Sequence, residues 1–294
     1  MNYRKRYIHR GLTIFIVLVC GWSAVQVRSA SAPDGDLPAA SGGKSIDAKP
    51  DRSERTRPED KIIVVDPPEK KFFSKVLDYQ GIPIKAHKDV ADEALFAARD
   101  RLSAMLVNLP DVRLSLHKAG AELHIIGRNQ VTSDLPEWRQ MKDKPFDGDQ
   151  TIDQRTRGMG GLLTSCGEEN LLKLEKDRYK GRDICVHEFA HNIFDNGSEA
   201  ETRDKFKQQY RRSLDKGLWK KSYAGSNIDE FFAELSMWYF GTHGDLRMTG
   251  PKPENGAEGL KKYDPEAFTL IDEFYSGRMT RRNDAGGGNS HSTN

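Results

Sequence analysis

Two histidines and a glutamate in one short segment have the types and spacing of a metal-assisted hydrolase. His187 and His191 stand four residues apart, so on a helix both imidazoles lie on one face and can reach the same ion. Glu188 lies beside that face, where it can hold a proton without binding the metal. Asp183 is suited to capping the start of such a helix. The alternative is two surface histidines on an amphipathic helix.

A catalytic zinc needs a third protein ligand and one open position. A third histidine through a His-x-x-Gly-x-x-His extension is excluded, because Phe194 occupies the glycine position. Better candidates are Glu230 and Glu234, which lie four residues apart among aromatic neighbours. Carboxylates are costly to bury there unless a cation awaits them. The spacing of the charges permits either glutamate as the third ligand. The alternative is that both lie on a solvated polar face of an amphipathic helix. His243, in a Gly-Thr-His-Gly turn, is the last-ranked candidate for the third ligand.

The two motifs together resemble a known family of enzymes. His187-Glu188-x-x-His191, followed by a tyrosine and seven residues later by Glu-Phe-Phe-Ala-Glu, is similar to gluzincin zinc metallopeptidases such as the anthrax lethal factor catalytic domain and the Pro-Pro endopeptidases. The match covers roughly residues 183–240. It implies a zincin-like fold and one Zn²⁺ per chain.

The resemblance also implies a role for each residue of the motifs. The zinc ligands would be His187, His191 and Glu230, with Glu188 as the general base. The hydroxyl of Tyr223 would stabilise the oxyanion. Glu234 would orient a ligand histidine from outside the metal's coordination shell.

The tyrosine assignment has competitors. Tyr210 and Tyr239 lie within reach of the same region, and Tyr223 is alternatively a core tyrosine with a satisfied hydroxyl.

The first 32 residues are typical of a signal peptide. A basic head up to Arg10 precedes an apolar run, Leu12–Cys20, and small residues at 30–32. Arg28 and Pro33 fit a cleavage site poorly, so an uncleaved signal anchor is the alternative. We predict a secreted or extracellular protein, with periplasmic or cell-surface-anchored placement as the alternative.

The rest of the chain divides by composition. Residues 33–60 and 280–294 have too few apolar side chains to offset the entropy of ordering, so we predict a disordered linker and a disordered tail. Residues 61–279 would form the zinc metallopeptidase domain. Removing residues 1–32 takes away five Lys/Arg and no acid, so the net charge falls from +2 to −3. Nucleic-acid binding thereby loses its main support.

Two cysteines, Cys166 and Cys185, remain after removal of the signal. In an oxidising compartment they predict one disulfide that ties the segment before the His187 helix to that helix. Two buried thiols are the alternative.

Apolar patterning predicts a strand-rich first part and a helical second part. The expected helices are 67–79, 89–106, 183–195, 199–214, 226–240 and 264–275. The expected strands are 61–65, 82–84, 112–116, 122–126 and 160–165, and residues 128–156 are expected to be a long polar loop. This order is typical of an α+β fold. With the resemblance, we expect a small mixed sheet packed on an active-site helix, with a C-terminal helical cluster.

These features predict a monomeric, secreted zinc endopeptidase that hydrolyses peptide bonds through a metal-activated water. Its partner would be a peptide or protein substrate, with no nucleic acid, and with a membrane only if the anchor is uncleaved. The alternatives are an inactive zincin-fold binding module and a zinc hydrolase acting on a non-protein amide or a cell-wall peptide.

Substrate contacts are expected in two places. The strand at 160–165 is expected to be the sheet edge lining the cleft, where an extended substrate could add as a strand. An ordinary core strand is the alternative. Glu168 and Glu169 are candidates for binding an amine, or are solvated acids.

Overall fold

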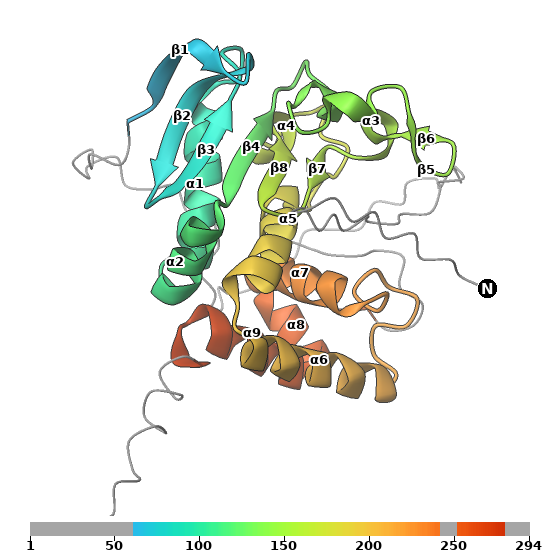
Figure 1. The fold of residues 1–294 in the computed structure, drawn as a ribbon. Coiled ribbons are helices and arrows are strands. Elements are labelled where there is room, and N and C mark those ends of the chain that lie inside the picture. The colour runs from blue at the N-terminus through green and yellow to red at the C-terminus, as the bar shows by residue number, and fades with distance from the viewer. Residues whose placement is uncertain (1–60, 242–251, 280–294) are drawn as a thin grey trace, which may run out of the picture.

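The protein is a mixed sheet with helices packed on it and grouped at one end (Figure 1). The structure, a computed structural model, describes residues 61–241 and 252–279. The expected signal segment, linker and tail, and His243, lie outside the described residues. Within the described part, no helix is long and apolar enough to cross a membrane.

The sheet has six strands in the order β1-β2-β3-β4-β8-β7. Strand β4 runs parallel to both β3 and β8, while the β1-β2, β2-β3 and β7-β8 pairs are antiparallel. The strands are β1 (Ile63–Glu69), β2 (Phe73–Tyr79), β3 (Ile82–Ala86), β4 (Glu122–Ile126), β7 (Gly158–Met159) and β8 (Leu163–Gly167). The predicted α+β class with a mixed sheet is therefore confirmed.

Most of the predicted helices are present, with small shifts at their ends. They are α1 (Asp92–Leu106), α5 (Ile184–Asn192), α6 (Ala200–Asp215), α7 (Ile228–Tyr239) and α9 (Pro265–Tyr275). Two shorter helices, α4 (Glu168–Leu171) and α8 (Ala257–Tyr263), were not predicted. Helix α5 continues into a turn of π-helix, Ile193–Gly197. Helices α6 to α9 lie together at the lower end of α5 in Figure 1.

The predicted helix at 67–79 is wrong. Phe73, Leu77 and Tyr79 are buried in strand β2, which pairs with β3 through a two-residue turn at Gln80 and Gly81. Both turn residues have positive φ, 48° and 92°, which suits the twist of a tight hairpin. The apolar residues of this segment fit one face of a helix as well as a strand. The segment forms a strand because it pairs with β3 in the hairpin.

The predicted strand at 112–116 is also wrong. Those residues belong to helix α2 (Pro110–Ala119), in which Val112 and Leu116 are the buried positions, four apart. Pro110 starts this helix rather than merely following the previous one, and Gly120 ends it with φ 79°. Proline at the first turn and glycine just past the last one are the usual boundary residues of a helix.

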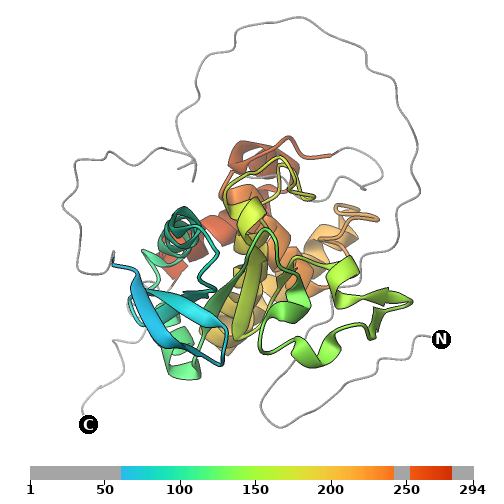
Figure 2. The same cartoon turned by 90° about the horizontal axis from the view of Figure 1, so that it is seen from above.

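Residues 128–156 are more than a loop. They form short elements that lie beside β7 in Figures 1 and 2. Leu135, Trp138 and Ile152 from this segment pack in a small apolar core with Phe73 and Ile126 of the sheet. The elements are two 3-10 turns (Thr132–Asp134 and Arg139–Met141), β5 (Pro145–Asp147), β6 (Gln150–Thr151) and α3 (Ile152–Arg155).

The main core lies between the sheet and the helices. Leu123 and Ile125 of β4 point into it with Phe189 of α5, whereas His124 and Ile126 point to the other face. Helix α5 packs on β8 and on α7. This packing buries all nine residues of α5, so its polar side chains must find partners inside the protein.

Candidate metal centre

The start of helix α5 is fixed by buried polar contacts. Asp183 caps it as predicted, because its carboxylate accepts a hydrogen bond from the N–H of Val186 at 3.1 Å. The other carboxylate oxygen accepts from Nε of Arg101 in α1 at 2.9 Å. Both partners of this ion pair are almost fully buried. The orientation of α5 on the sheet is therefore tied to α1 as well as to its own cap.

Helix α7 supplies the candidate carboxylates. Asn227 caps this helix by accepting hydrogen bonds from the N–H groups of Asp229 and Glu230, both at 2.9 Å. Glu230 therefore lies in the first turn, and Glu234 lies one turn further along the same face. Both carboxylates are buried, Glu234 completely.

The structure brings His187, His191 and Glu230 together. Nε2 of His187 lies 3.3 Å from Nε2 of His191 and 3.2 Å from Oε2 of Glu230. Oε2 of Glu230 lies 3.6 Å from Nε2 of His191. The three atoms form a compact triangle inside the protein, and this group could hold a metal ion.

The dimensions of the triangle fit a small tetrahedral ion. Zinc binds imidazole nitrogen and carboxylate oxygen at about 2.0–2.1 Å, so two such ligands at a tetrahedral angle lie about 3.3–3.4 Å apart. The observed separations of 3.2, 3.3 and 3.6 Å bracket that value. Oε2 of Glu230 has no hydrogen-bond partner among the described residues. A buried polar atom without a partner is costly, and a cation bound between the three residues would provide a partner for this oxygen.

Glu234 lies behind His187, on the side away from the triangle. Its Oε1 is 3.3 Å from Nδ1 of His187 and accepts a hydrogen bond from Arg182 at 2.6 Å. The contact with Nδ1 is within range but is not aligned as a good hydrogen bond. Position thus separates the two glutamates, because Glu230 faces Nε2 and Glu234 faces Nδ1 of the same imidazole.

Glu188 lies next to the triangle without belonging to it. Its side chain is buried, and its Oε2 has no hydrogen-bond partner among the described residues. Burial raises the pKa of this carboxyl, against the opposing effect of His187 and His191. A carboxylate with a raised pKa is a better proton acceptor near neutral pH than an exposed one.

Tyr223 is the tyrosine nearest the candidate ligands. Its ring stacks on His187 with centroids 5.9 Å apart and planes inclined by 21°. Burial, together with Glu230 and Glu188, raises the pKa of its hydroxyl well above the usual value, which keeps the hydroxyl proton in place. The two competitors are engaged elsewhere: Tyr210 donates to the carbonyl of Gly225, and Tyr239 donates to Asp272.

The histidines attract protons in the metal-free protein. Burial lowers the pKa of His187, but Glu230 and Glu234 outweigh it and raise the value to about 10. The pKa of His191 is also raised, because Glu230 outweighs burial. His187 and His191 in turn hold the pKa of Glu230 low, against the effect of burial. A metal must therefore displace protons to bind here.

The sheet edge beside this site is strand β7. The strand predicted at 160–165 was expected to be that edge, and this expectation is wrong in detail. Strand β8 lies between β4 and β7, and the two-residue β7 forms the edge. Added Cβ atoms would lie 3.1 Å from Cγ of Glu188 at Gly158 and 3.0 Å from Cβ of His191 at Gly160. Glycine at these positions lets the backbone approach α5 closely.

Glu168 and Glu169 are not solvated acids. Both are buried and paired within the chain, Glu168 with Arg128 at 2.5 Å and Glu169 with Arg157 at 2.6 Å. The solvated alternative is therefore wrong, and the partner arginines come from segments that the sequence does not mark as neighbours. Binding of an amine by these two residues stays a prediction.

Cys166 and Cys185 are free thiols, so the structure has the two buried thiols and not the predicted disulfide. Cys166 on β8 and Cys185 on α5 are completely buried in the main core. Burial and a hydrogen bond to Cys185 raise the pKa of the Cys166 thiol. Packing as small apolar groups is common for buried cysteines.

Two residues near the site were not singled out from the sequence. Asp195 follows His191 by four residues, and burial and the neighbouring Asp229 raise its pKa to about 6. Its spacing on the helix was a usable signal. Arg182, which contacts Glu234 across 52 positions in the chain, gave no such signal.

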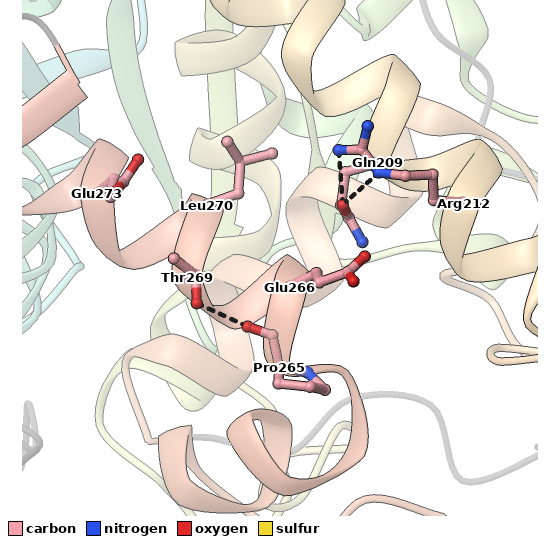
Figure 3. A pocket seen from close by; sticks show the side chains of 7 residues that line it. All are labelled: Gln209, Arg212, Pro265, Glu266, Thr269, Leu270 and Glu273. Atoms are coloured by element: carbon pink, nitrogen blue, oxygen red, sulfur yellow. Dashed lines mark hydrogen bonds between the residues drawn. The ribbon is translucent and has the colours of Figure 1, made fainter.

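Two surface hollows are not lined by the candidate ligands. One, of about 520 Å³, lies between α6 and α9 (Figure 3), where Arg212 donates to Gln209 and Thr269 donates to the carbonyl of Pro265. The other, of about 500 Å³, lies between residues 128–131 and 174–178. Neither concerns His187, His191 or Glu230.

Comparison with protein-family models finds no match for this chain, and comparison with curated proteins finds none either. The functional argument therefore depends on the site itself.

Proposed function

We propose that this protein is a zinc-dependent endopeptidase of zincin-like fold that acts outside the cytoplasm on a peptide or protein substrate. The observation that carries the proposal is the buried triangle of His187, His191 and Glu230, whose separations match a tetrahedral zinc site. The resemblance of the two sequence motifs to gluzincins supports the same assignment.

The choice of zinc follows from the donor set. Two imidazole nitrogens and one carboxylate oxygen form the three-ligand set of many hydrolytic zinc sites, which leave one position open. Sites for calcium or magnesium use oxygen ligands. When bound, zinc would supply Lewis-acid chemistry that polarises a carbonyl group and makes a water molecule more acidic.

The protein's own groups would handle the proton and the oxyanion. Glu188 is placed beside the ligand triangle and carries a raised pKa. It would take a proton from the attacking water and deliver it to the leaving amine. Tyr223, with its proton held by a raised pKa, would donate a hydrogen bond to the developing oxyanion.

An extended substrate would lie along the edge strand β7. This strand passes over α5 at Gly158, and Gly160 just after it is equally close, so a peptide paired with β7 would run close to Glu188. Strand addition supplies affinity through main-chain hydrogen bonds and leaves side-chain preferences to the surrounding walls.

The test combines metal content with cleavage of a peptide library. Purified protein should hold about one zinc per chain, because the donor set describes a single site. Glu188→Gln should retain the zinc and lose roughly 10²–10⁴-fold in cleavage rate, the usual contribution of a general base. Glu201→Gln, an exposed glutamate on α6, is the matched control and should behave like the wild type.

Two outcomes would contradict the proposal. Absence of zinc after reconstitution would remove the mechanism as a whole. Zinc binding without cleavage above the Glu188→Gln background would favour the binding-module alternative.

A further inference from the structure

Arg182 is the last residue before the capping residue of α5, and its side chain reaches the candidate site. Its guanidinium donates to Oε1 of Glu234 at 2.6 Å, the short distance of a charge-assisted hydrogen bond. The same oxygen faces Nδ1 of His187. We propose that Arg182 is a positioning residue for the metal centre, which acts through Glu234 to set the orientation of His187.

The backbone around Arg182 is held on both sides. Asn170 donates to the carbonyl of Arg182 and accepts from the N–H of Ile184, both at 2.8 Å. Asp183, between them, is paired with Arg101. These contacts fix the backbone of Arg182, and with it the point from which the side chain extends to Glu234.

Charge balance gives Arg182 a specific task. Glu188, Glu230 and Glu234 are three buried carboxylates around one site. A divalent ion would offset two negative charges, and Arg182 contacts the third carboxylate. A buried carboxylate that loses its partner is costly, so Glu234 without Arg182 would tend to turn away from its present position beside His187.

The consequence for His187 follows from its ring chemistry. A neutral imidazole that donates from Nδ1 has its lone pair on Nε2, the atom that faces His191 and Glu230. Glu234 can accept from Nδ1 only while its carboxylate keeps the orientation in which Arg182 holds it, 3.3 Å from that nitrogen. Carboxylates in this position commonly fix the ring orientation of a metal-bound histidine. Arg182 would in turn fix the orientation of that carboxylate.

This inference rests on the metal site of the proposed function, and zinc affinity tests it without any activity assay. We expect Arg182→Gln to weaken zinc binding roughly 10-fold to 100-fold in competition with a chromophoric chelator, the usual cost of losing an outer partner of a ligand. Arg182→Lys, which keeps the charge, should recover part of the affinity. Arg211→Gln, an exposed arginine on α6, is the matched control and should leave the affinity unchanged.

A double-mutant cycle separates action through Glu234 from a general loss of structure. If Arg182 acts through Glu234, adding Arg182→Gln to Glu234→Gln should weaken zinc binding no further. Full additivity of the two substitutions would overturn the proposal, as would wild-type affinity in Arg182→Gln. A wild-type protein that binds no zinc would instead refute the proposed function, so the two failures are distinguishable.

Discussion

Two buried groups of histidine and carboxylate side chains lie on opposite faces of the sheet, and their geometries differ. In the His124 cluster (Glu122, His124 and Glu137), both ring nitrogens have a partner: Nδ1 is 2.6 Å from Glu137 and Nε2 is 2.8 Å from Glu122. Lys85 closes the network at 2.9 Å from Glu122. This cluster satisfies the histidine with protein groups alone.

The His187 cluster (His187, His191 and Glu230) is arranged in another way. Two ring nitrogens face each other at 3.3 Å, and Oε2 of Glu230 approaches both at 3.2 and 3.6 Å without an aligned hydrogen bond. Nδ1 of His191 has no partner among the described residues. The histidine rings of both clusters are buried, whereas the Glu122 side chain is 20% exposed. The two clusters therefore differ in where their ring nitrogens point. Those of His124 each face a separate carboxylate, whereas Nε2 of His187 and Nε2 of His191 converge with Oε2 of Glu230, and only such convergence indicates a metal.

The largest effect expected from this comparison concerns zinc affinity. Glu230→Ala removes a ligand and should weaken zinc binding roughly 100-fold to 1000-fold, because a structural zinc site shares about 10–16 kcal/mol among four ligands. Glu137→Ala removes a carboxylate that lies even closer to a histidine, at 2.6 Å, and should leave zinc affinity unchanged. Chelator competition measures both. An effect of Glu234→Ala larger than that of Glu230→Ala would reverse the choice of ligand.

The second effect concerns stability without metal. With a chelator present, His124→Leu should lower the free energy of unfolding by about 3 kcal/mol, since it removes the histidine from Glu137 and leaves Glu122 with Lys85 alone. His191→Leu should cost less, about 1 to 2 kcal/mol, because Glu230 keeps His187 and the lost ring has an unpartnered Nδ1 and a close nitrogen–nitrogen contact. Urea unfolding followed by tryptophan fluorescence compares the two. Equal losses would mean that the geometric difference has no energetic counterpart.

The same contrast explains what could be predicted from the sequence. The His187 helix was predictable because its cap, its spacing and its apolar neighbours are all local. Glu230 was predictable through the second motif and its resemblance to gluzincins, whereas charge spacing alone permitted Glu234 as well; in the structure the two face different nitrogens of His187. The His124 cluster was invisible, because Glu137 reaches the strand from a segment without apolar periodicity.

The wrong predictions of the fold also have physical causes. In β2 the apolar residues fit both the periodicity of a helix and that of a strand, and hydrogen bonding to β3 makes the segment a strand. In α2 the boundary residues Pro110 and Gly120 were present but were assigned to neighbouring elements. Strand β7, the edge closest to the site, is only two residues long, which is too short for any pattern. Arg182 meets Glu234 only when α5 and α7 pack together.

The smallest effect is the pH dependence that the His124 cluster contributes to stability. Burial raises the pKa of Glu122, but the hydrogen bonds from His124 and Lys85 outweigh it and lower the value from 4.5 to about 2. A carboxyl whose folded pKa is depressed contributes stability above its unfolded pKa and loses it as the pH falls. Glu122 should therefore contribute fully above about pH 5 and lose about 2 kcal/mol between pH 6 and pH 3.

His124 sets the opposite limit of the same window. Its pKa is raised, because the hydrogen bonds to Glu122 and Glu137 outweigh burial, so its contribution is complete below 6.5 and is lost as the pH rises through the folded value. Urea unfolding of the wild type and of Glu122→Gln, with zinc chelated, isolates the acid limb. The stability difference between the two proteins should shrink from pH 6 to pH 3. A constant difference would mean that Glu122 does not pair with His124 as an ionised carboxylate. The His124 cluster would then no longer serve as the example of a histidine whose ring nitrogens are satisfied by protein carboxylates alone.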